Sequence, residues 1–392
     1  MLSLHEMLEK KDDVGAKPIF FDLSQTADQN KLSALFADNK IQHVSDDFEE
    51  QHQELFAVRN PTIVYTAGFK EKFKKYYEEL KTQKPLQEHG HWVYFPWLSK
   101  IVHILAEEDF FIVRTARNKN LINTEEQEKF HNAKIGIGGL SVGSSVAYAM
   151  TLQGGPKHVK LADMDRLALS NTNRILSGVD NLGMLKVEMA ARFMYQINPY
   201  MEIELYPDGL TPENIEGFCK DLDVVIDELD NLSVKFLIRE QAKKYKIPVV
   251  MAADNGDNAV VDVERYDLEP DMPYFHGRMG DVSYDMLTKL DKFGIGKMIT
   301  KHVGPENVTE RMQQSLMEMG KTIVSWPQLG GAALINGAAV AYCVRKILNS
   351  QPLEKNRALV YLDEKLIPTW NEPTEIKKRA AIADGFRKIF GL

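Results

Sequence analysis

From residue 134 to residue 266 the chain alternates short apolar runs with amphipathic runs, and this rhythm constrains the fold more than any other feature. The apolar runs fit buried strands, and the runs between them repeat apolar residues at helical spacing. Strands that alternate with helices form a parallel sheet with crossover connections. We therefore predict an α/β fold with a doubly wound, Rossmann-like, mostly parallel sheet, which binds ligands at the carboxyl ends of its strands. The predicted strands are 134–137, 158–162, 202–206, 222–226, 247–252 and 258–266, and the predicted helices are 144–153, 184–197, 212–219 and 234–245.

The chain before this region has a different pattern and is predicted to fold separately. Residues 1–110 are expected to form a small N-terminal α/β domain that could recognise a peptide or another substrate, and residues 111–392 the second domain. The first domain would contain strands at 17–23 and 41–45, helices at 27–39, 47–58 and 69–82, an extended segment at 62–67 and an aromatic segment at 92–97. In the second domain, the glycines and charges of residues 270–325, densest at 291–314, predict a crossing loop.

Charge and composition narrow the class of protein. The chain has 48 Lys and Arg against 56 Asp and Glu, a net charge of −8, which disfavours nucleic acids and anionic membranes as partners. Residues 1–11 are polar and charged, unlike a secretion signal, and the apolar stretch 332–344 is shorter than the roughly 20 residues of a membrane span. Two cysteines, Cys219 and Cys343, are too few for a disulfide framework. We predict a reduced, cytoplasmic protein.

The loop after the first predicted strand of the second domain is rich in glycine. It reads GIGGLSVGS over residues 136–144, with Gly138, Gly139 and Gly143 between strand and helix. Glycines at this place let the backbone approach phosphate groups. The match to a dinucleotide fingerprint is incomplete, because Leu140 stands where a further glycine is expected. A tight turn without a ligand would show the same residues.

Two acidic residues, Asp163 and Asp165, follow the next predicted strand. A carboxylate at this position accepts hydrogen bonds from the ribose of a nucleotide. The glycine turn and these carboxylates together indicate a nucleotide site. A nicotinamide or flavin enzyme would show the same pair, so a dinucleotide oxidoreductase stays open.

Cationic residues further along favour ATP. Arg174 ends the segment SNTNR at 170–174, and Lys186 opens a predicted helix. Hydride transfer does not need these cations, whereas an enzyme that handles a triphosphate uses them to stabilise developing negative charge. Asp230, in the segment DELDN at 227–231, is a candidate ligand for Mg²⁺, which takes one or two carboxylates together with phosphate oxygens. We predict ATP and Mg²⁺ as cofactors.

The order of these motifs resembles the HesA/MoeB/ThiF/ubiquitin-activating superfamily of adenylyltransferases. The motifs are the glycine turn, D-x-D, S-N-x-N-R, a lysine, N-P at 198–199 and D-x-x-D-N, with R-x-x-R at 114–117 upstream. The resemblance extends from residue 114 to near residue 357. It implies an enzyme that activates a carboxylate as its acyl-adenylate, consumes ATP, releases pyrophosphate and works as a homodimer.

The resemblance also implies roles for single residues. Arg117 would act as an arginine finger on the ATP of the partner subunit, so a dimer would complete both sites. Asp230 would carry Mg²⁺. The implied catalytic residues are Arg117, Arg174, Lys186 and Asp230, and the implied cofactor-binding residues are Gly138, Gly139, Gly143, Asp163, Asp165, Asn171, Asn173 and Asn231.

The sequence departs from the family in its cysteines. It lacks C-x-x-C pairs, so no structural zinc is expected, and no cysteine lies between Cys219 and Cys343 to receive an acyl group as a thioester. An amine, amide, hydroxyl or carbon nucleophile would then attack the acyl-adenylate directly. Cysteine-poor members of the family include peptide-antibiotic maturation enzymes of the microcin C and pantocin types and the dehydratase that cyclises threonylcarbamoyladenosine in tRNA.

The additional N-terminal domain and the acidic charge favour a peptide or small carboxylate substrate, as in the maturation of peptide natural products. The tRNA dehydratase type stays an alternative. So does a non-catalytic nucleotide-binding partner, although such a partner is expected to lose Arg174, Lys186 and Asp230, which are present here.

Overall fold

The computed structural model describes residues 15–392, and the chain divides into two compact units. Unit 1 runs to Thr124 and includes Tyr195–Tyr200, and unit 2 comprises Glu125–Met194 and Met201–Leu392. The segment 1–11, which we expected not to be a secretion signal, lies outside the described residues. Each unit is described by itself below.

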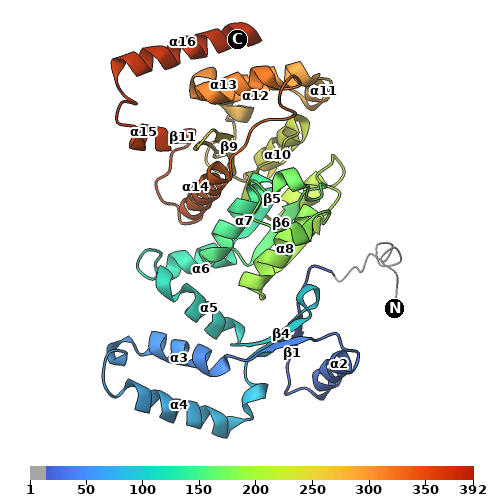
Figure 1. Cartoon of the computed structure of the whole chain (residues 1–392), viewed down its shortest axis with the longest axis vertical. Coiled ribbons are helices and arrows are strands. Elements are labelled where there is room, and N and C mark those ends of the chain that lie inside the picture. Colours follow the sequence, from blue (N-terminus) through green and yellow to red (C-terminus); the bar gives the residue numbers. More distant parts are fainter. Residues whose placement is uncertain (1–14) are drawn as a thin grey trace. The chain divides into compact units, whose positions relative to one another are not determined.

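Unit 1 is built on a four-stranded sheet with the order β1-β3-β4-β2 (Figure 1). β2 runs parallel to β4, and the other two pairs are antiparallel. The strands are β1 (Ile19–Phe21), β2 (His43–Ser45), β3 (His91–Phe95) and β4 (Lys100–Ile104), and the helices are α2 (Thr26–Ala37), α3 (Phe48–Arg59), α4 (Phe69–Gln83) and α5 (Glu107–Thr115). Short 3₁₀ turns complete the unit: η1 (Pro61–Ile63), η2 (Leu86–Glu88), η3 (Pro96–Leu98) and η4 (Ala116–Asn118).

The prediction of an extended segment at 62–67 was wrong, because η1 begins at Pro61 and turns follow it. Proline fixes φ near the helical value, which favours the first residue of such a turn over a strand.

The core of unit 1 is aromatic around one histidine. The buried His103 ring stacks between Phe48, at 3.8 Å, and Trp92, at 4.4 Å between ring centroids.

Unit 2 confirms the predicted mostly parallel, doubly wound sheet. Its seven strands have the order β11-β10-β9-β8-β5-β6-β7, in which β5 to β9 pair in parallel and β10 and β11 are antiparallel additions. The strand order reverses between β5 and β8, which is where such sheets bind ligands. The strands are β5 (Lys134–Gly138), β6 (His158–Ala162), β7 (Glu202–Tyr206), β8 (Val224–Asp227), β9 (Val249–Asn255), β10 (Asn258–Glu264) and β11 (Arg357–Val360).

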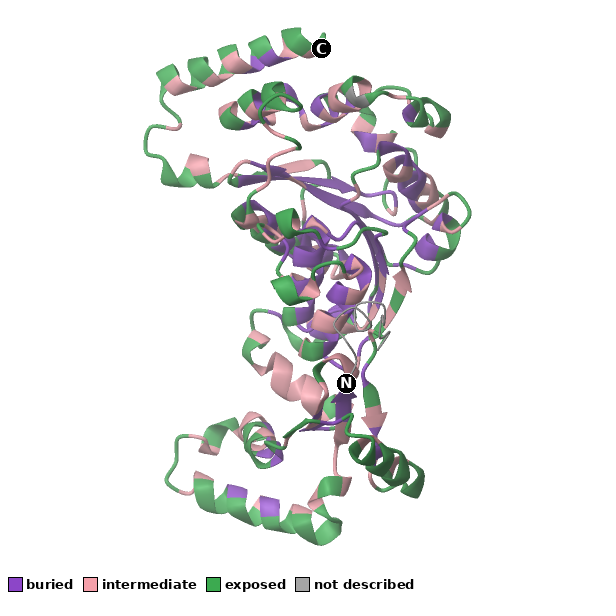
Figure 2. Cartoon of the chain, turned by 45° about the vertical axis from the view of Figure 1, so that its right-hand side comes forward, coloured by how far each residue is buried: buried purple, intermediate pink, exposed green. Residues whose placement is uncertain are grey.

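Helices cover both faces of this sheet, and most of its strand residues are buried (Figure 2). Side chains alternate between the faces, so Ile137 meets α7 at Gly143 while Gly136 meets Phe218 of α9. α7, α8 and α14 lie on one face, and α9 and α10 lie on the other (Figure 1). These helices are α7 (Val142–Leu152), α8 (Lys186–Ile197), α9 (Ile215–Cys219), α10 (Leu232–Tyr245) and α14 (Gly330–Leu348), with α6 (Thr124–Asn132) before the sheet and the turns η5 (Leu169–Asn171) and η6 (Val179–Asn181) after β6.

Helix α14 is longer than the apolar stretch 332–344 predicted. Among the described residues it is the one helix that could cross a membrane by length and composition, and half of its apolar window is buried inside the protein. A Cβ atom at Gly337 would lie 2.6 Å from the carbonyl oxygen of Ser145, so α14 packs directly against α7. This close contact is that of a core helix.

The prediction of a crossing loop at 270–325 was wrong in its secondary structure, because the segment is largely helical. The Asp291 Oδ1 atom accepts the Gly294 amide at 2.7 Å and caps α12, and Ser283 caps α11 in the same way. Leu287 and Met298 are buried, so packing offsets the low helix propensity of the glycines. The segment contains η7 (Tyr274–Gly277), α11 (Tyr284–Thr288), α12 (Lys292–Val303), η8 (Pro305–Asn307) and α13 (Glu310–Glu318), and α15 (Leu362–Leu366) and α16 (Pro373–Phe390) end the chain.

A buried ion cluster ties the sheet to α10. Arg239 donates to Asp227 at 2.6 Å and lies 2.7 Å from a Glu264 oxygen, and its guanidinium stacks 3.9 Å from the Phe275 ring centroid. Burial by itself would raise the pKa of Asp227, but Lys235 and Arg239 together bring that pKa below its usual value. Asp227 therefore stays ionised at the end of β8 without contact with water.

Candidate functional site

The glycine turn forms a tight connection between β5 and α7. Gly139 has a φ of +85°, which residues with a side chain rarely adopt, and its amide donates to the Ala162 carbonyl at 2.8 Å. The Glu228 amide, at the end of β8, donates to the Gly138 carbonyl at 2.8 Å. The turn is thus fixed from both neighbouring strands, and it leads into the first turn of α7, where amides and the helix dipole favour an anion.

Asp163 lies beside this turn at the end of β6. Its Oδ2 atom accepts the Leu140 amide at 2.7 Å, and its Oδ1 atom accepts the Asp165 amide at 2.8 Å. The side chain is buried, and burial raises the pKa of Asp163 against the opposing effect of Lys186 and these hydrogen bonds. The carboxylate is held in one orientation, as a ribose-binding group requires.

Lys186 opens α8 and points to the two predicted ribose-binding carboxylates. Its Nζ atom lies 2.8 Å from Asp165 and 3.7 Å from Asp163, and only 7% of its side chain is exposed. The structure therefore brings together three predicted site residues from two segments of the chain. A lysine that is buried among carboxylates has a fixed position, so its charge is available at one place only.

Arg174 joins the site from the loop after η5. Its Nε atom donates to the Ser141 hydroxyl at 3.0 Å, next to the start of α7. Arg174 also donates to the Asn173 side chain at 2.9 Å, and the Asn173 amide donates to the Gln328 carbonyl at 2.8 Å. Asn171 instead accepts the Ala168 amide at 3.0 Å and fixes its own loop. A guanidinium now stands at the same helix end as the glycine turn.

Asp230 and Asn231 lie at the start of α10, after β8. The Asn231 Oδ1 atom accepts the amides of Ser233 at 2.9 Å and Val234 at 3.3 Å, so it caps the helix. Asp230 is exposed. No group of three or more His, Cys, Asp or Glu side chains suited to a metal occurs in the described part of the chain. Mg²⁺ needs one carboxylate when phosphate oxygens and water supply the other ligands, and Asp230 fits that limited role.

The remaining predicted residue belongs to unit 1, and the two cysteines belong to unit 2. Arg117 is exposed on η4 in unit 1. Both cysteines are buried in unit 2, and burial raises the pKa of Cys219 to about 12 and that of Cys343 to about 11. A thiol with such a pKa carries almost no thiolate near neutral pH, and the thiolate is the nucleophilic form.

The sequence analysis missed Asp254, at the end of β9. Asn336 of α14 donates to one of its carboxylate oxygens, and Gln328 donates to the other at 3.1 Å. Burial raises the pKa of Asp254 to about 6, although these hydrogen bonds and the charge of Arg174 lower it. The signal was available, because Asp254 ends a buried strand as Asp163 and Asp227 do.

A second missed acid is Glu228, which follows β8. Its Oε1 atom accepts the Ala252 amide at 2.9 Å, and burial raises its pKa well above the usual value. Glu228, Asp163 and Asp254 thus place three buried carboxyl groups at the carboxyl ends of β8, β6 and β9, with β5 between β8 and β6. With Lys186 and Arg174, this edge of the sheet offers hydrogen-bond acceptors for a ribose and cations for phosphates.

In comparison with known proteins, the same region matches a protein family. Residues 115–266 match the ThiF family, and this range contains every site residue predicted from the sequence. An uncharacterized protein of Mycobacterium tuberculosis is 37% identical over 303 residues, which cover 77% of this chain and 42% of that protein. The tRNA threonylcarbamoyladenosine dehydratase of Escherichia coli is 32% identical over 128 residues, which cover 32% of this chain and 47% of that enzyme.

The chain thus spans less than half of the length of either relative. Among solved structures, Escherichia coli MccB with ATP is similar with a TM-score of 0.47 and 16% identity, over 67% of this chain and 77% of that one. With a score below 0.5 this similarity has no bearing on the site. The sequence match covers the region that holds the site residues: residues 115–266 match the ThiF family, and this part of the chain is similar to the ThiF- and MoeB-type adenylyltransferases.

Proposed function

We propose that this protein is an ATP-dependent adenylyltransferase that activates a carboxylate as its acyl-adenylate and releases pyrophosphate. One observation carries the proposal. Lys186 and Arg174, two cations with no use in hydride transfer, stand with Asp163 around the glycine turn at the switch point of the sheet. Fixed cations at such a place stabilise the charge that develops when a phosphoryl bond breaks.

In this reaction a carboxylate oxygen attacks the α-phosphorus of ATP, and the bond to the bridging oxygen of pyrophosphate breaks. The turn at Gly138–Gly139 and the first turn of α7 would bind the phosphates, and Asp163 would accept the ribose hydroxyls. Lys186 and Arg174 would stabilise charge on the α-phosphate and on the leaving group. Mg²⁺, held by Asp230 together with phosphate oxygens, would neutralise the departing pyrophosphate.

The second half of the reaction would proceed without a thioester. Both cysteines are buried, with pKa values far above neutral pH, which supports direct attack of an amine, amide, hydroxyl or carbon nucleophile on the acyl-adenylate. Asp254 is a candidate acceptor for the proton that such a nucleophile loses, because its pKa of about 6 suits a general base near neutral pH.

For the substrate we propose a peptide in the maturation of a peptide natural product. Support comes from the separate N-terminal α/β unit and the net charge of −8, which disfavours nucleic acid and anionic membranes. We further propose a cytoplasmic homodimer in which Arg117 serves the partner's ATP. A dehydratase acting on tRNA is the second candidate, since the Escherichia coli enzyme of that name is 32% identical over its aligned segment.

Two other classes are less well supported. A dinucleotide oxidoreductase would leave Lys186 and Arg174 without a role, and a non-catalytic partner would have no need to keep either cation. A non-catalytic partner would bind ATP but would not exchange pyrophosphate into it, and the oxidoreductase is separated from the proposal by the melting temperature with each nucleotide. A ligand that binds only the native state raises this temperature by mass action. ATP with Mg²⁺ should raise it, and NAD, NADP and FAD should not.

Adenylation itself is tested by the exchange of labelled pyrophosphate into ATP when candidate peptides are added. Exchange that depends on a peptide supports the proposed substrate class, and exchange that depends on threonylcarbamoyladenosine-containing tRNA supports the second candidate. Stabilisation by a dinucleotide without stabilisation by ATP would contradict both.

A further inference from the structure

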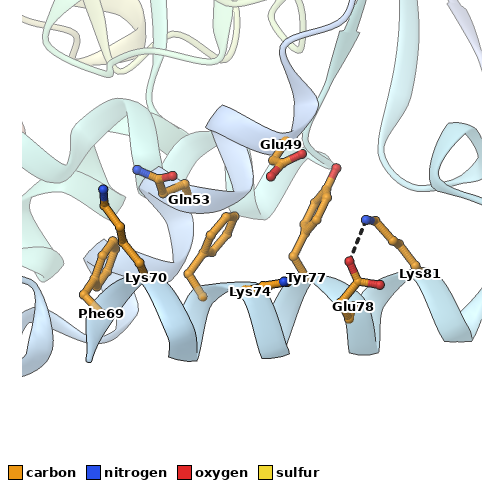
Figure 3. Close-up of a pocket in the computed structure, with 9 residues that line it drawn as sticks. Glu49, Gln53, Phe69, Lys70, Lys74, Tyr77, Glu78 and Lys81 are labelled. Carbon is orange, nitrogen blue, oxygen red and sulfur yellow. Dashed lines mark hydrogen bonds and ion pairs between the residues drawn. The ribbon is translucent and has the colours of Figure 1, made fainter. Parts of the chain in front are cut away.

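Unit 1 contains a groove that the nucleotide site does not use. It lies between α3 and α4 and has a volume of about 370 Å³ (Figure 3). The side chains of α4 form most of its lining, and Glu49 and Gln53 enter from α3. All of these residues belong to unit 1, so the groove is complete within that unit.

The floor of the groove is aromatic, and its rings contact one another. Phe69, Phe73 and Tyr77 repeat every four residues on α4 and so share one face of the helix. The Phe73 and Tyr77 rings stack at 5.6 Å, and Phe56 of α3 contacts both Phe69, at 5.7 Å, and Phe73, at 5.9 Å. Phe73 and Tyr77 are buried and Phe69 is partly exposed, so Phe69 offers most of the apolar ring surface to a large side chain.

Lysines border this floor, and two of them are not engaged in ion pairs. Lys70 and Lys74 line the groove, and neither makes an ion pair or hydrogen bond among the described residues. The third lysine of the lining, Lys81, is paired with Glu78 at 2.8 Å. Lys70 and Lys74 are four residues apart, so their side chains start from the same face of α4. They offer two adjacent positive charges beside an apolar floor.

We propose that this groove binds an acidic peptide segment, with an aromatic or large aliphatic side chain on the floor and carboxylates at Lys70 and Lys74. The carboxylates of Glu49 and Glu78 also border the groove, so negative charge is accepted only near Lys70 and Lys74. A peptide that alternates carboxylates with apolar side chains can meet this condition better than a nucleic acid, which carries a charge on every phosphate. The assignment deepens the proposed function, on which it rests, because the groove would hold a part of the substrate that does not react.

The probe for this proposal is a fluorescein-labelled peptide FEEFEEF, titrated with the full-length protein and followed by fluorescence anisotropy. The controls are the amide counterpart FQQFQQF and a labelled decauridylate. The test variant is Lys70→Gln with Lys74→Gln. The matched variant is Lys72→Gln with Lys75→Gln, which removes the same charge from exposed positions of the same helix outside the groove.

The proposal expects FEEFEEF to bind and FQQFQQF to bind at least about tenfold more weakly. The Lys70/Lys74 variant should bind FEEFEEF with about tenfold lower affinity, since each hydrogen bond to a charged group contributes on that scale. The Lys72/Lys75 variant should bind as the parent does. Equal losses in both variants, equal binding of both peptides, or stronger binding of decauridylate would overturn it, as would no binding at all. Stabilisation by ATP is measured on the same samples: if ATP stabilises and the peptide does not bind, the groove assignment fails while adenylation stands.

Discussion

A Cβ atom at Gly139 would lie 2.2 Å from the carbonyl oxygen of Glu228. The glycine turn after β5 and the loop after β8 therefore touch through their main chains, at the point where the strand order reverses. No side chain fits between them, so the shape of the nucleotide turn depends on the loop that also carries Asp230.

The substitution Gly139→Ala should lower stability and weaken ATP binding together. A positive φ costs a residue with a side chain about 1–3 kcal/mol, and the contact with Glu228 adds to this cost because a main chain cannot move aside. Urea unfolding and the ATP-induced shift in melting temperature measure the two effects.

The matched control is Gly183→Ala. Gly183 has nearly the same φ, +83°, but a Cβ atom there meets nothing within 4 Å. This variant should lose only the cost of the backbone conformation. Equal stability losses in the two variants would show that the contact with Glu228 is unimportant.

Replacing Lys186 by methionine should reduce pyrophosphate exchange by about 10²–10³. It removes a cation from the proposed phosphate site and leaves the buried Asp163 with a higher pKa, since Lys186 now lowers it. Lys220→Met, at an exposed position, is the control. Unchanged exchange in the Lys186→Met protein would remove Lys186 from the reaction.

Stability should depend on pH through Asp254. Its pKa is about 6 in the folded protein, against an ordinary value of 3.8 for an aspartate in an unfolded chain, so the folded state favours the protonated form. The stabilisation is fully present below pH 3.8 and is lost as the pH rises through 6, a change of about 3 kcal/mol. The side chain of the Asp254→Asn variant does not titrate. The unfolding free energy of this variant minus that of the parent should therefore increase between about pH 4 and pH 7.

Urea unfolding at several pH values across this range follows the difference, and Asp257→Asn, at an exposed position in the following turn, should run parallel to the parent. A constant difference between the Asp254→Asn protein and the parent would show that the carboxyl group has the same pKa in both states.

The double substitution Cys219→Ala with Cys343→Ala should leave turnover largely intact. Both thiols are buried, so the variant loses packing, about 1 kcal/mol for each site, but no nucleophile. Turnover is measured alongside the melting temperature. A variant that folds but has lost turnover would restore the thioester route.

Mixing the Arg117→Ala and Lys186→Ala proteins tests the proposed dimer. Each variant should be inactive alone, because every site would draw Lys186 from one chain and Arg117 from the other. Random exchange gives about half mixed dimers, each with one intact site. If activity stays absent after subunit exchange has been confirmed, Arg117 does not act in trans.

The regular part of the fold could be predicted from the sequence. β6 and β7 have the predicted bounds, since each alternates polar and apolar residues between turn residues. The predicted helix at 212–219 shortens to α9, which begins at Ile215. Asn214 explains the difference, because its side chain accepts the Thr211 amide at 2.8 Å and holds a turn in place of the first helical residues.

The site could be predicted only where its residues follow a strand directly. Asp163 was found in this way, and its contact with Lys186 was not, because no periodicity connects residues on two segments. Asp254 could have been found from its place at the end of a strand. Its burial could not, because its donor Asn336 lies 82 residues along the chain and depends on how α14 packs. The helices of 284–318 were missed because glycines normally end helices. Here buried residues of these helices pack into the protein, and this packing stabilises them despite the glycines.

Arg239 is enclosed by Asp227 and Glu264, and this arrangement limits how the sequence can change over time. Loss of one member leaves an uncompensated charge away from water, at a cost of about 3–5 kcal/mol, whereas joint replacement by apolar residues of similar size is often neutral. Drift at these three positions must therefore pass through an unstable intermediate. Descendants of this chain should keep all three residues or exchange them together, and a homologue with only one of them replaced should carry a compensating change nearby.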